Sequence, residues 1–318
     1  MAEPSPAFWD GRAVAVTGGA GFLGSAVVRD LHGLGADVRV VRSADHDLRD
    51  PRAARAAVDG AEAVIHLAAN VGGIGFNRAN PAPLVYDNLM MAANVFEQSR
   101  DAGVAKLVAA CTVCAYPKLV DAPFSEDDLW NGYPEESNAP YGLAKTMMLV
   151  LSDAYRRQYG FDSCAPIVAN LYGPNDNFDP ESSHVIPALI RKFVEAGERG
   201  DDAVTLWGTG KPSREFLYVD DAARALILAA EHLDSSDPVN LGTGVETRIR
   251  DLAETIKGLT GFEGEVEWDA SKPDGQPARF LDVSRARALI GFEAEMPLEE
   301  GLRRTVESFR IQRASVAG

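Results

Sequence analysis

The stretch TGGAGFLG, residues 17–24, follows a short apolar run, AVAVT (13–17), and precedes an amphipathic segment, SAVVRDLHGLG (25–35). The apolar run favours a buried strand, and the apolar spacing after the glycines predicts a helix. Gly18, Gly21 and Gly24 allow a tight turn and the close approach of a pyrophosphate to the start of that helix. The pattern predicts a strand–turn–helix unit that binds a dinucleotide, and a purely structural turn is the alternative.

Apolar runs and helical patterns alternate on both sides of this unit. Strands are expected at 37–41, 61–69 and 106–112, and helices at 51–58 and 88–103. Such alternation predicts a parallel sheet with helices on both faces, whose ligands lie at the carboxyl ends of the strands. We therefore expect an α/β fold, a Rossmann-type doubly wound parallel sheet.

The texture of the chain changes near residue 170, where proline, glycine and short mixed segments become common. Helical patterns remain at 185–197, 219–232, 248–259 and 298–311. We expect a dinucleotide-binding Rossmann domain over 1–170 and a smaller mixed α/β substrate-binding domain over 171–318. The segment 214–244 is expected to pack back on the first domain.

Composition excludes several classes of protein. The net charge of −16 argues against nucleic acid, because such a partner requires a basic field. No apolar run reaches the ~20 residues that span a bilayer. The N-terminus, MAEPSPAFWDGR, lacks the basic and apolar regions of a signal peptide. We expect a cytoplasmic protein without a membrane or nucleic-acid partner.

Two of the three cysteines lie in CTVCAYPK, residues 111–118, at a spacing that also occurs in redox and zinc sites. A zinc site needs more ligands than Cys164 and the scattered histidines supply, so we expect no metal. Redox pairs favour a helix start, whereas Cys111 ends a strand-like run. The spacing of Cys111 and Cys114 is therefore interpreted as incidental.

A tyrosine and a lysine share a helix face in YGLAK, residues 141–145. Lys145 is expected to lower the pKa of Tyr141 by its charge and to hydrogen-bond the nicotinamide ribose, so that Tyr141 serves as acid or base. Thr112 ends the fourth expected strand, at the sheet edge where a cofactor would lie. Its hydroxyl is expected to bind the substrate oxygen that Tyr141 protonates.

The residue after the second strand bears on the cofactor. NAD-preferring sites place an acid there, whereas this chain has Arg42, which suits the 2′-phosphate of NADP. A solvated arginine beside Asp45 and Asp47 is the alternative. NADP(H) is favoured, and NAD(H) stays open.

With these motifs in place, the chain resembles the extended short-chain dehydrogenase/reductase superfamily. The resemblance covers nearly the whole chain, in family order: TGGAGFLG, DLRD (47–50), HLAA (66–69), YGLAK, NLYGP (170–174), REFLYVDD (214–221) and NLGTG (240–244). Within it the chain is most similar to the GDP-L-fucose synthase family, through ANVGGI (69–74), VCAYPKL (113–119), NLYGPNDNF (170–178), SSHVIPALIRK (182–192) and SKPDG (271–275).

That resemblance implies an enzyme that epimerises carbons 3 and 5 of a 4-keto nucleotide sugar and then reduces carbon 4. Thr112, Tyr141 and Lys145 fall on the catalytic triad, and Cys114 and His184 on the acid/base pair for epimerisation. The implied cofactor residues, besides Tyr141 and Lys145, are Gly18, Gly21, Phe22, Leu23, Gly24, Arg42, Asp47, Leu48, Leu67, Ala68 and Ala69. The implied residues for a nucleotide-diphosphate sugar are Asn170, Lys192, Trp207, Arg214 and Arg279. The resemblance also implies a homodimer.

The chain departs from this family at several positions. Ala20 replaces an arginine of the glycine loop, and Ser43 or Ala44 replaces a second basic residue near the 2′-phosphate. Lys192 stands where an arginine is usual, and a lysine cannot make a bidentate phosphate contact. A related nucleotide sugar in place of the fucose precursor is therefore an alternative substrate. Because the same Thr112, Tyr141 and Lys145 set serves both reactions, a redox-neutral, NAD-dependent 4-epimerase is the alternative function, and a non-catalytic sensor or scaffold on the same fold is a third.

Overall fold

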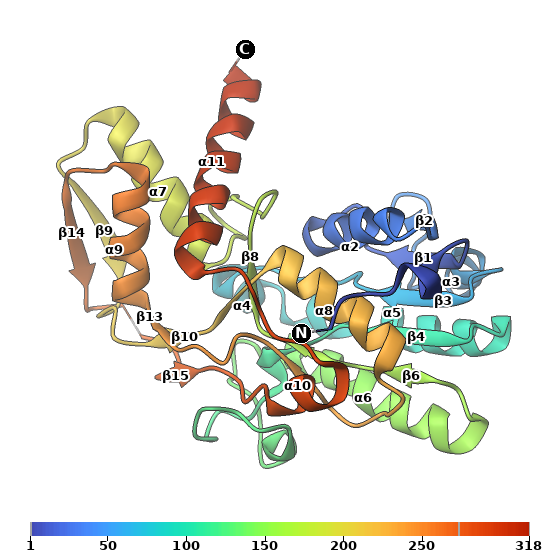
Figure 1. Ribbon diagram of the computed structural model, residues 1–318. Helices are drawn as coiled ribbons and strands as arrows, with labels where there is room; N and C mark the ends of the chain where they lie inside the picture. Colours follow the sequence, from blue (N-terminus) through green and yellow to red (C-terminus); the bar gives the residue numbers. More distant parts are fainter. Residues whose placement is uncertain (1, 273, 318) are drawn as a thin grey trace.

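The computed structural model describes residues 2–272 and 274–317. Parallel strands and helices alternate along the chain, which gives the α/β, Rossmann-type fold that the sequence predicts. Figure 1 shows this sheet and its helices on the right and a second group of elements, α7, α9, β9 and β14, on the left. In the described ranges no helix is both long and apolar enough to cross a bilayer.

The main sheet has five parallel strands in the order β2-β1-β3-β4-β6. These strands are β1 (Ala13–Thr17), β2 (Asp37–Val41), β3 (Ala63–His66), β4 (Lys106–Ala109) and β6 (Ser163–Cys164). The chain runs from β1 to β2 on one side and then returns to β3 on the other side of β1. This reversal places a ligand-binding crevice at the carboxyl ends of β1 and β3.

Shorter strands form a separate three-stranded sheet in the order β12-β7-β5. β5 (Cys111–Thr112) follows β4 after one residue, and it pairs in parallel with β7 (Ile167–Val168), which pairs with β12 (Asn240–Leu241). The expected strand 106–112 is thus present, with an interruption at Ala110. Thr112 lies at the carboxyl end of this run, as predicted.

Two groups of helices accompany the sheet. α2 (Phe22–Gly33) packs against α8 (Val219–His232), whereas α5 (Pro81–Ala102) packs against α3 (Pro51–Val58) and α6 (Ala139–Tyr159). The expected helix 88–103 begins seven residues earlier, at Pro81. A proline suits the first helical position because its missing N–H has no helical acceptor there.

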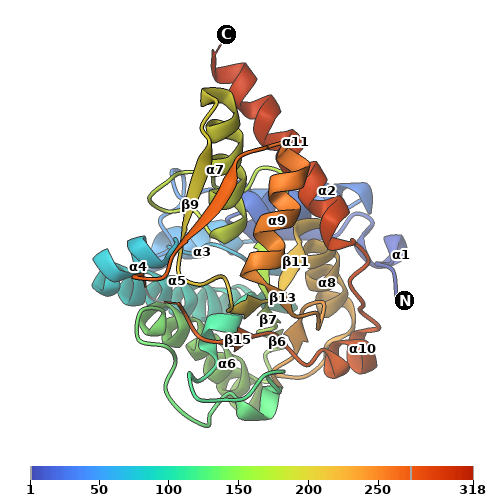
Figure 2. The same ribbon diagram turned by 90° about the vertical axis from the view of Figure 1, so that its left-hand side faces the viewer.

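A second hydrophobic core lies among α7 (Val185–Arg199), α9 (Ile249–Thr260) and α11 (Leu298–Ala317). Ile190, Phe193, Leu252 and Leu302 are among its buried residues. In Figure 2 these helices stand beside β9 (Ala203–Trp207), which pairs in parallel with β14 (Glu265–Asp269). Each of the four helices expected after residue 170 is present, with ends that differ by up to six residues.

Short strands connect the two cores. β8 (Asn170–Tyr172) pairs with β11 (Phe216–Tyr218), and β10 (Ser213–Arg214) lies between β13 (Thr247–Arg248) and β15 (Ala278–Arg279). Leu217 to Leu241 and Leu281 to Phe292 contribute to the core of the main sheet, so the chain crosses between the two parts repeatedly. The division near residue 170 stays a prediction. The remaining elements are α1 (Pro6–Trp9), α4 (Ile74–Ala79), η1 (Val113–Ala115), η2 (Glu126–Asp128) and α10 (Ser284–Ile290).

Candidate active site

The glycine loop between β1 and α2 leaves no room for side chains. Gly18 has φ 69°, and a Cβ there would lie 2.8 Å from the backbone nitrogen of Ala68. A Cβ on Gly24 would lie 2.1 Å from the carbonyl oxygen of Gly18. No side chain caps the first turn of α2 beyond Gly21, so its amides are available to an anion. The loop therefore fits a dinucleotide pyrophosphate.

The ends of β1 and β3 are joined by a threonine and a histidine that the motif analysis did not single out. The Thr17 hydroxyl oxygen accepts from the amides of Leu67 and Ala68 and lies 2.7 Å from His66 Nδ1. Because the oxygen already accepts twice, its proton is donated to Nδ1, which places the His66 proton on Nε2. Burial, with the charge of Lys145 second, lowers the pKa of His66 to about 3.

This neutral imidazole bears on the cofactor. Nε2 of His66 is buried and has no partner among the described residues. The predicted cofactor residues Leu67, Ala68 and Ala69 follow directly at the crevice. A buried donor beside a glycine cradle is consistent with a polar ligand at this edge of the sheet. The HLAA string could have indicated this site, because a histidine such as His66 at the end of an apolar strand needs a hydrogen-bonding partner.

The residues after β2 give a mixed outcome. Arg42 is exposed, and it has no ion pair in the ranges that the structure describes. Asp47 pairs instead with Arg49 at 2.7 Å, which holds the pKa of Asp47 at about 2. Leu48 is buried in the main core. An exposed, unpaired Arg42 is compatible both with a contact to a phosphate and with the alternative of a solvated arginine, so the preference for NADP(H) stays a prediction.

The turn that follows β5 packs on the start of α6. Thr112 Oγ1 accepts from the Cys114 amide at 3.2 Å and so caps the short helix η1. A Cβ on Gly142 would lie 2.3 Å from the carbonyl oxygen of Cys114. Only a glycine in α6 allows this approach, which packs the turn that carries Thr112 and Cys114 against the residue that follows Tyr141.

The electrostatics of Tyr141 differ from the expectation. Burial, with the neighbouring Cys114 and Cys111 as smaller causes, raises the pKa of Tyr141. The prediction that Lys145 lowers this pKa is wrong for the protein alone, because desolvation of the phenolate dominates and Lys145 is not among the causes. Lys145 is itself buried without a carboxylate partner among the described residues, and burial lowers its pKa to about 8.

The second cysteine of the pair has a separate place. Cys111 is 3% exposed in the main core, and its thiol lies 3.5 Å from the Lys145 carbonyl oxygen. Burial raises the pKa of Cys111 to about 11. Cys114 is half-buried, and no disulfide joins the two in this structure. Their spacing is therefore incidental, as the sequence indicated.

We expect Cys111→Ala to lower the free energy of unfolding by about 1 kcal/mol, because a buried sulfur leaves a small cavity. Turnover should stay within about twofold of wild type, since the thiol faces a backbone carbonyl and not the crevice. Urea unfolding and a steady-state assay check both. A large loss of rate at unchanged stability would contradict this assignment.

Two of the predicted substrate residues lie side by side. Arg214 and Arg279 are register partners in β10 and β15, and neither pairs with a carboxylate in the described ranges. Burial, and then the charge of Arg279, lowers the pKa of Arg214 to about 10. Arg279 Nη1 lies 3.6 Å from Cys114 Sγ. The arginine pair (Arg214 and Arg279) is a cationic site next to the thiol, suited to an anion such as a diphosphate.

The other predicted substrate residues surround β8 and β9. Asn170 Nδ2 donates to the carbonyl oxygen of Glu215 at 2.9 Å, beside Arg214. Lys192 Nζ, on α7, donates to the carbonyl oxygen of Thr205 at 3.3 Å. Trp207 ends β9 and is 72% exposed, with the Lys272 ammonium over its ring at 5.7 Å from the centroid, and an exposed indole of this kind can stack on a base. No contact among the described residues joins Lys192 or Trp207 to the arginine pair.

His184 occupies the N-cap position of α7 without a side-chain capping bond and is solvent-exposed, yet desolvation by nearby protein lowers its pKa. The loop before it is held on the segment after β3, because the Gly73 amide donates to the Ser182 carbonyl oxygen at 2.8 Å. A Cβ on Gly73 would lie 2.5 Å from the Ser183 carbonyl oxygen. In the part of the chain that the structure describes, no contact joins His184 to Cys114, so their pairing stays a prediction.

The same loop contains a buried carboxyl. Asp176 is 8% exposed, and burial raises its pKa to about 7. Oδ1 accepts from the Asn177 amide at 2.7 Å, whereas Oδ2 has no partner among the described residues. Between about pH 4 and 7 the unfolded chain loses this proton while the folded chain keeps it, so the free energy of unfolding falls as pH rises.

We expect Asp176→Asn to remove this pH dependence. The free energy of unfolding of wild type falls with pH, whereas that of the variant should not. The difference between the two should therefore shift in favour of the variant by about 2–3 kcal/mol as the pH rises from about 4.5 to 8. Urea unfolding of both proteins across that range measures the difference. A difference that stays constant with pH would show that the Asp176 proton is not retained on folding.

Two more positions escaped the sequence analysis. Glu215 is 1% exposed and accepts from the amides of Gly244 at 2.7 Å and Leu281 at 2.8 Å, so it fixes the strand that carries Arg214. Gln276 contacts both members of the arginine pair. In REFLYV, Glu215 stands directly before an apolar run, where an acidic residue is buried only if it has a hydrogen-bonding partner. This placement was the available sequence signal for Glu215. No local pattern marks Gln276.

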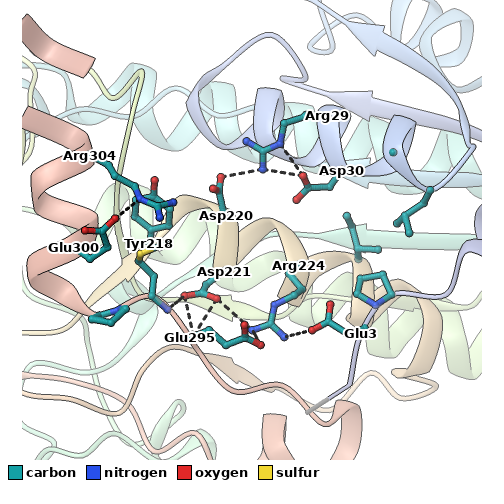
Figure 3. Close-up of a pocket in the computed structure, with 16 residues that line it drawn as sticks. Glu3, Arg29, Asp30, Tyr218, Asp220, Asp221, Arg224, Glu295, Glu300 and Arg304 are labelled. Carbon is teal, nitrogen blue, oxygen red and sulfur yellow. Dashed lines mark hydrogen bonds and ion pairs between the residues drawn. The ribbon is translucent and has the colours of Figure 1, made fainter. Parts of the chain in front are cut away.

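The structure also has a surface cavity of about 810 Å³ between α2, α8 and the start of α11. None of the predicted site residues lines it. Figure 3 shows that its three arginines are each bonded to acidic side chains: Arg29 to Asp30 and Asp220, Arg224 to Asp221 and Glu295, and Arg304 to Glu300. It is therefore not the candidate site. In the described residues no group of three or more His, Cys, Asp or Glu could hold a metal ion.

Comparison with known proteins agrees with this geometry. Residues 14–242 match the NAD dependent epimerase/dehydratase family. GDP-L-fucose synthase of Escherichia coli K12 is 42% identical over 308 residues, which cover 93% of this chain and 96% of that protein. Probable GDP-L-fucose synthase 1 of rice, Oryza sativa subsp. japonica, is 42% identical over 97% of this chain and 95% of its own.

A solved structure extends the likeness to three dimensions. A GDP-L-fucose synthetase from Naegleria fowleri, bound to NADP, superposes with a TM-score of 0.88 at 30% identity. The match covers 99% of this chain and 98% of that one. The glycine cradle, the Tyr141–Lys145 helix and these matches lead to one conclusion: the chain belongs to the NAD dependent epimerase/dehydratase family.

Proposed function

We propose that this protein is a GDP-L-fucose synthase, which converts GDP-4-keto-6-deoxymannose into GDP-L-fucose by epimerisation at carbons 3 and 5 and reduction at carbon 4. One observation carries the proposal: the turn after β5 packs on Gly142, the neighbour of Tyr141 in α6, and the Cys114 sulfur on this turn lies 3.6 Å from Arg279 of the arginine pair. The names of relatives that are about 42% identical over nearly the full chain support it.

Epimerisation depends on the acidity of the protons that flank a ketone. Cys114 removes a proton from carbon 3 or 5, and His184 returns one on the opposite face, or the two exchange roles. The Arg279 guanidinium beside the sulfur stabilises negative charge that appears there. Thr112 and Tyr141 hydrogen-bond the carbon 4 oxygen and stabilise the enolate that forms.

Reduction uses the same carbonyl. A bound nicotinamide would supply the hydride for carbon 4. The Tyr141 hydroxyl gives its proton to the carbon 4 oxygen, and burial favours this role because it keeps the phenol protonated before the transfer. Lys145 binds the nicotinamide ribose, and its positive charge stabilises the phenolate that remains.

Substrate recognition is assigned to the residues around the arginine pair. Arg214 and Arg279 hold the diphosphate, with Asn170 beside them. Trp207 stacks on the base, and Lys192 contacts the phosphate from α7. The only hydrogen-bond acceptor that Lys192 has among the described residues is an uncharged backbone carbonyl oxygen. A hydrogen bond to a charged phosphate is stronger, so the lysine can exchange one for the other.

NADP(H) is the proposed cofactor. Arg42 is exposed and unpaired among the described residues, at the position that faces the 2′-group of the adenine ribose. The cofactor in the related structure from Naegleria fowleri is NADP. Ala20 offers no second cation, so the preference for NADP(H) over NAD(H) rests on Arg42. We therefore expect kcat/KM to be higher with NADPH than with NADH.

We also propose a homodimer. Val85, Tyr86 and Leu89 on α5 and Val150 on α6 are exposed apolar residues on two helices that pack together. A second copy of this face would cover them. Light scattering of the purified protein measures its mass.

A cofactor assay distinguishes this function from a 4-epimerase. With GDP-4-keto-6-deoxymannose, the reductase consumes one NADPH for each product molecule, whereas a redox-neutral 4-epimerase consumes none. A protein that carries tightly bound NAD⁺ and oxidises no NADPH on 4-keto sugars would contradict the proposal. Retained ligand binding without any turnover would instead indicate a sensor or scaffold.

A further inference from the structure

The arginine pair needs an element that orients it. Arg214 and Arg279 lie side by side without a carboxylate among the described residues, and these two cations, one half-buried and one buried, repel each other. A carboxylate would hold them but would also cancel the charge that binds an anion. A neutral acceptor orients a guanidinium and leaves its charge in place.

Gln276 supplies such an acceptor. Its Oε1 accepts from Arg279 Nε at 3.3 Å and Nη2 at 3.1 Å, along one edge of the guanidinium. Its backbone carbonyl oxygen accepts from Arg214 Nη1 at 2.7 Å. Its Nε2 donates to the carbonyl oxygen of Lys118 at 3.2 Å. Both ends of the amide and its backbone oxygen are thus in use.

These contacts lead to Cys114 by two routes. With Nε and Nη2 of Arg279 held by Gln276, Nη1 is directed to the Cys114 sulfur, 3.6 Å away. Lys118 follows Cys114 by four residues, so its bond to Gln276 ties the segment that carries the thiol to β15. One side chain therefore connects the thiol with both arginines.

We infer that Gln276 is a positioning residue that fixes Arg279 between the substrate diphosphate and the Cys114 sulfur. It acts through Arg279 and the Lys118 carbonyl, and it touches no reacting atom. The inference rests on the proposed function, which assigns the diphosphate to the arginine pair and proton transfer to Cys114.

Two substitutions separate orientation from charge. Gln276→Leu removes the acceptor but keeps the charge of Arg279, and it should lower GDP affinity about threefold to fivefold. Gln276→Glu pairs a carboxylate with Arg279 and sets an oxygen against the Lys118 carbonyl, and it should lower GDP affinity about tenfold or more. Gln158→Glu, at an exposed position of α6, is the control for the added charge.

The readouts are calorimetric titration with GDP, deuterium exchange at carbons 3 and 5 in D₂O, NADPH oxidation, and thermal melting. We expect both Gln276 variants to melt near wild type, to raise KM more than they lower kcat, and to slow exchange more than Gln158→Glu does. Thermal melting separates this from a general loss of structure, which would reduce the folded fraction without splitting KM from kcat.

If both Gln276 variants bind GDP and exchange deuterium as Gln158→Glu does, the inference is overturned. The proposed function stays intact in that case, provided that the wild-type protein turns over the 4-keto sugar. If wild type binds GDP but never turns over the 4-keto sugar, the proposed function fails. A loss of GDP affinity in the Gln276 variants would then still support the inference that Gln276 orients the arginine pair. A wild-type protein that does not bind GDP would contradict both.

Discussion

Tyr141→Phe is expected to lower the rate of carbon 4 reduction by about 10³-fold or more while GDP and NADPH still bind. The substitution removes one oxygen, and with it the proposed proton donor near the start of α6. General acid catalysis contributes about 10²–10⁴-fold to a rate, and the expected loss lies in the upper part of that range or beyond it.

Binding should survive because the ring of Tyr141 is buried and Phe retains its shape. Single-turnover NADPH oxidation and calorimetric titration with GDP measure the two effects separately. Tyr133→Phe is the matched control, since Tyr133 is 61% exposed on a loop. A Tyr141→Phe protein with more than a tenth of wild-type turnover would show that another group protonates the ketone.

Cys114→Ser is expected to abolish deuterium exchange at carbons 3 and 5 while reduction of the 4-ketone persists. A serine hydroxyl keeps the hydrogen bond to Arg279 but is a far weaker acid than a thiol, so proton removal should slow by about 10²-fold or more. Proton NMR of the sugar in D₂O measures exchange, and NADPH absorbance measures reduction.

Cys111→Ala serves as the control for this experiment, because Cys111 lies in the same turn but faces the core. Exchange at the wild-type rate in Cys114→Ser would make the thiol a packing residue. The reduced product of this variant would keep the configuration of its substrate at carbons 3 and 5, which NMR also resolves.

Local patterns predicted the parts of this molecule that depend on local physics. The spacing of Gly18, Gly21 and Gly24 predicted a backbone approach that the structure has, since a Cβ on Gly24 would strike Gly18. The i, i+4 spacing of Tyr141 and Lys145 placed both on one buried face of α6. Residue size and helical period decide such features without knowledge of the rest of the chain.

Other features depend on residues that are distant in sequence. Tertiary packing sets three of them. These are the close approach of Cys114 to Gly142, the hydrogen bonds of Glu215 with Gly244 and Leu281, and the contacts of Gln276. The pKa of Tyr141 belongs to this group as well. Charge spacing on a helix suggested that Lys145 lowers this pKa, but burial raises it and Lys145 is not among the causes.

NMR of the product made in D₂O from GDP-4-keto-6-deoxymannose and NADPH tests the proposed function as a whole. We predict GDP-L-fucose with deuterium at carbons 3 and 5, and one NADPH consumed for each molecule formed. A product that retains protium at both carbons, or one that forms without NADPH consumption, would contradict the proposal.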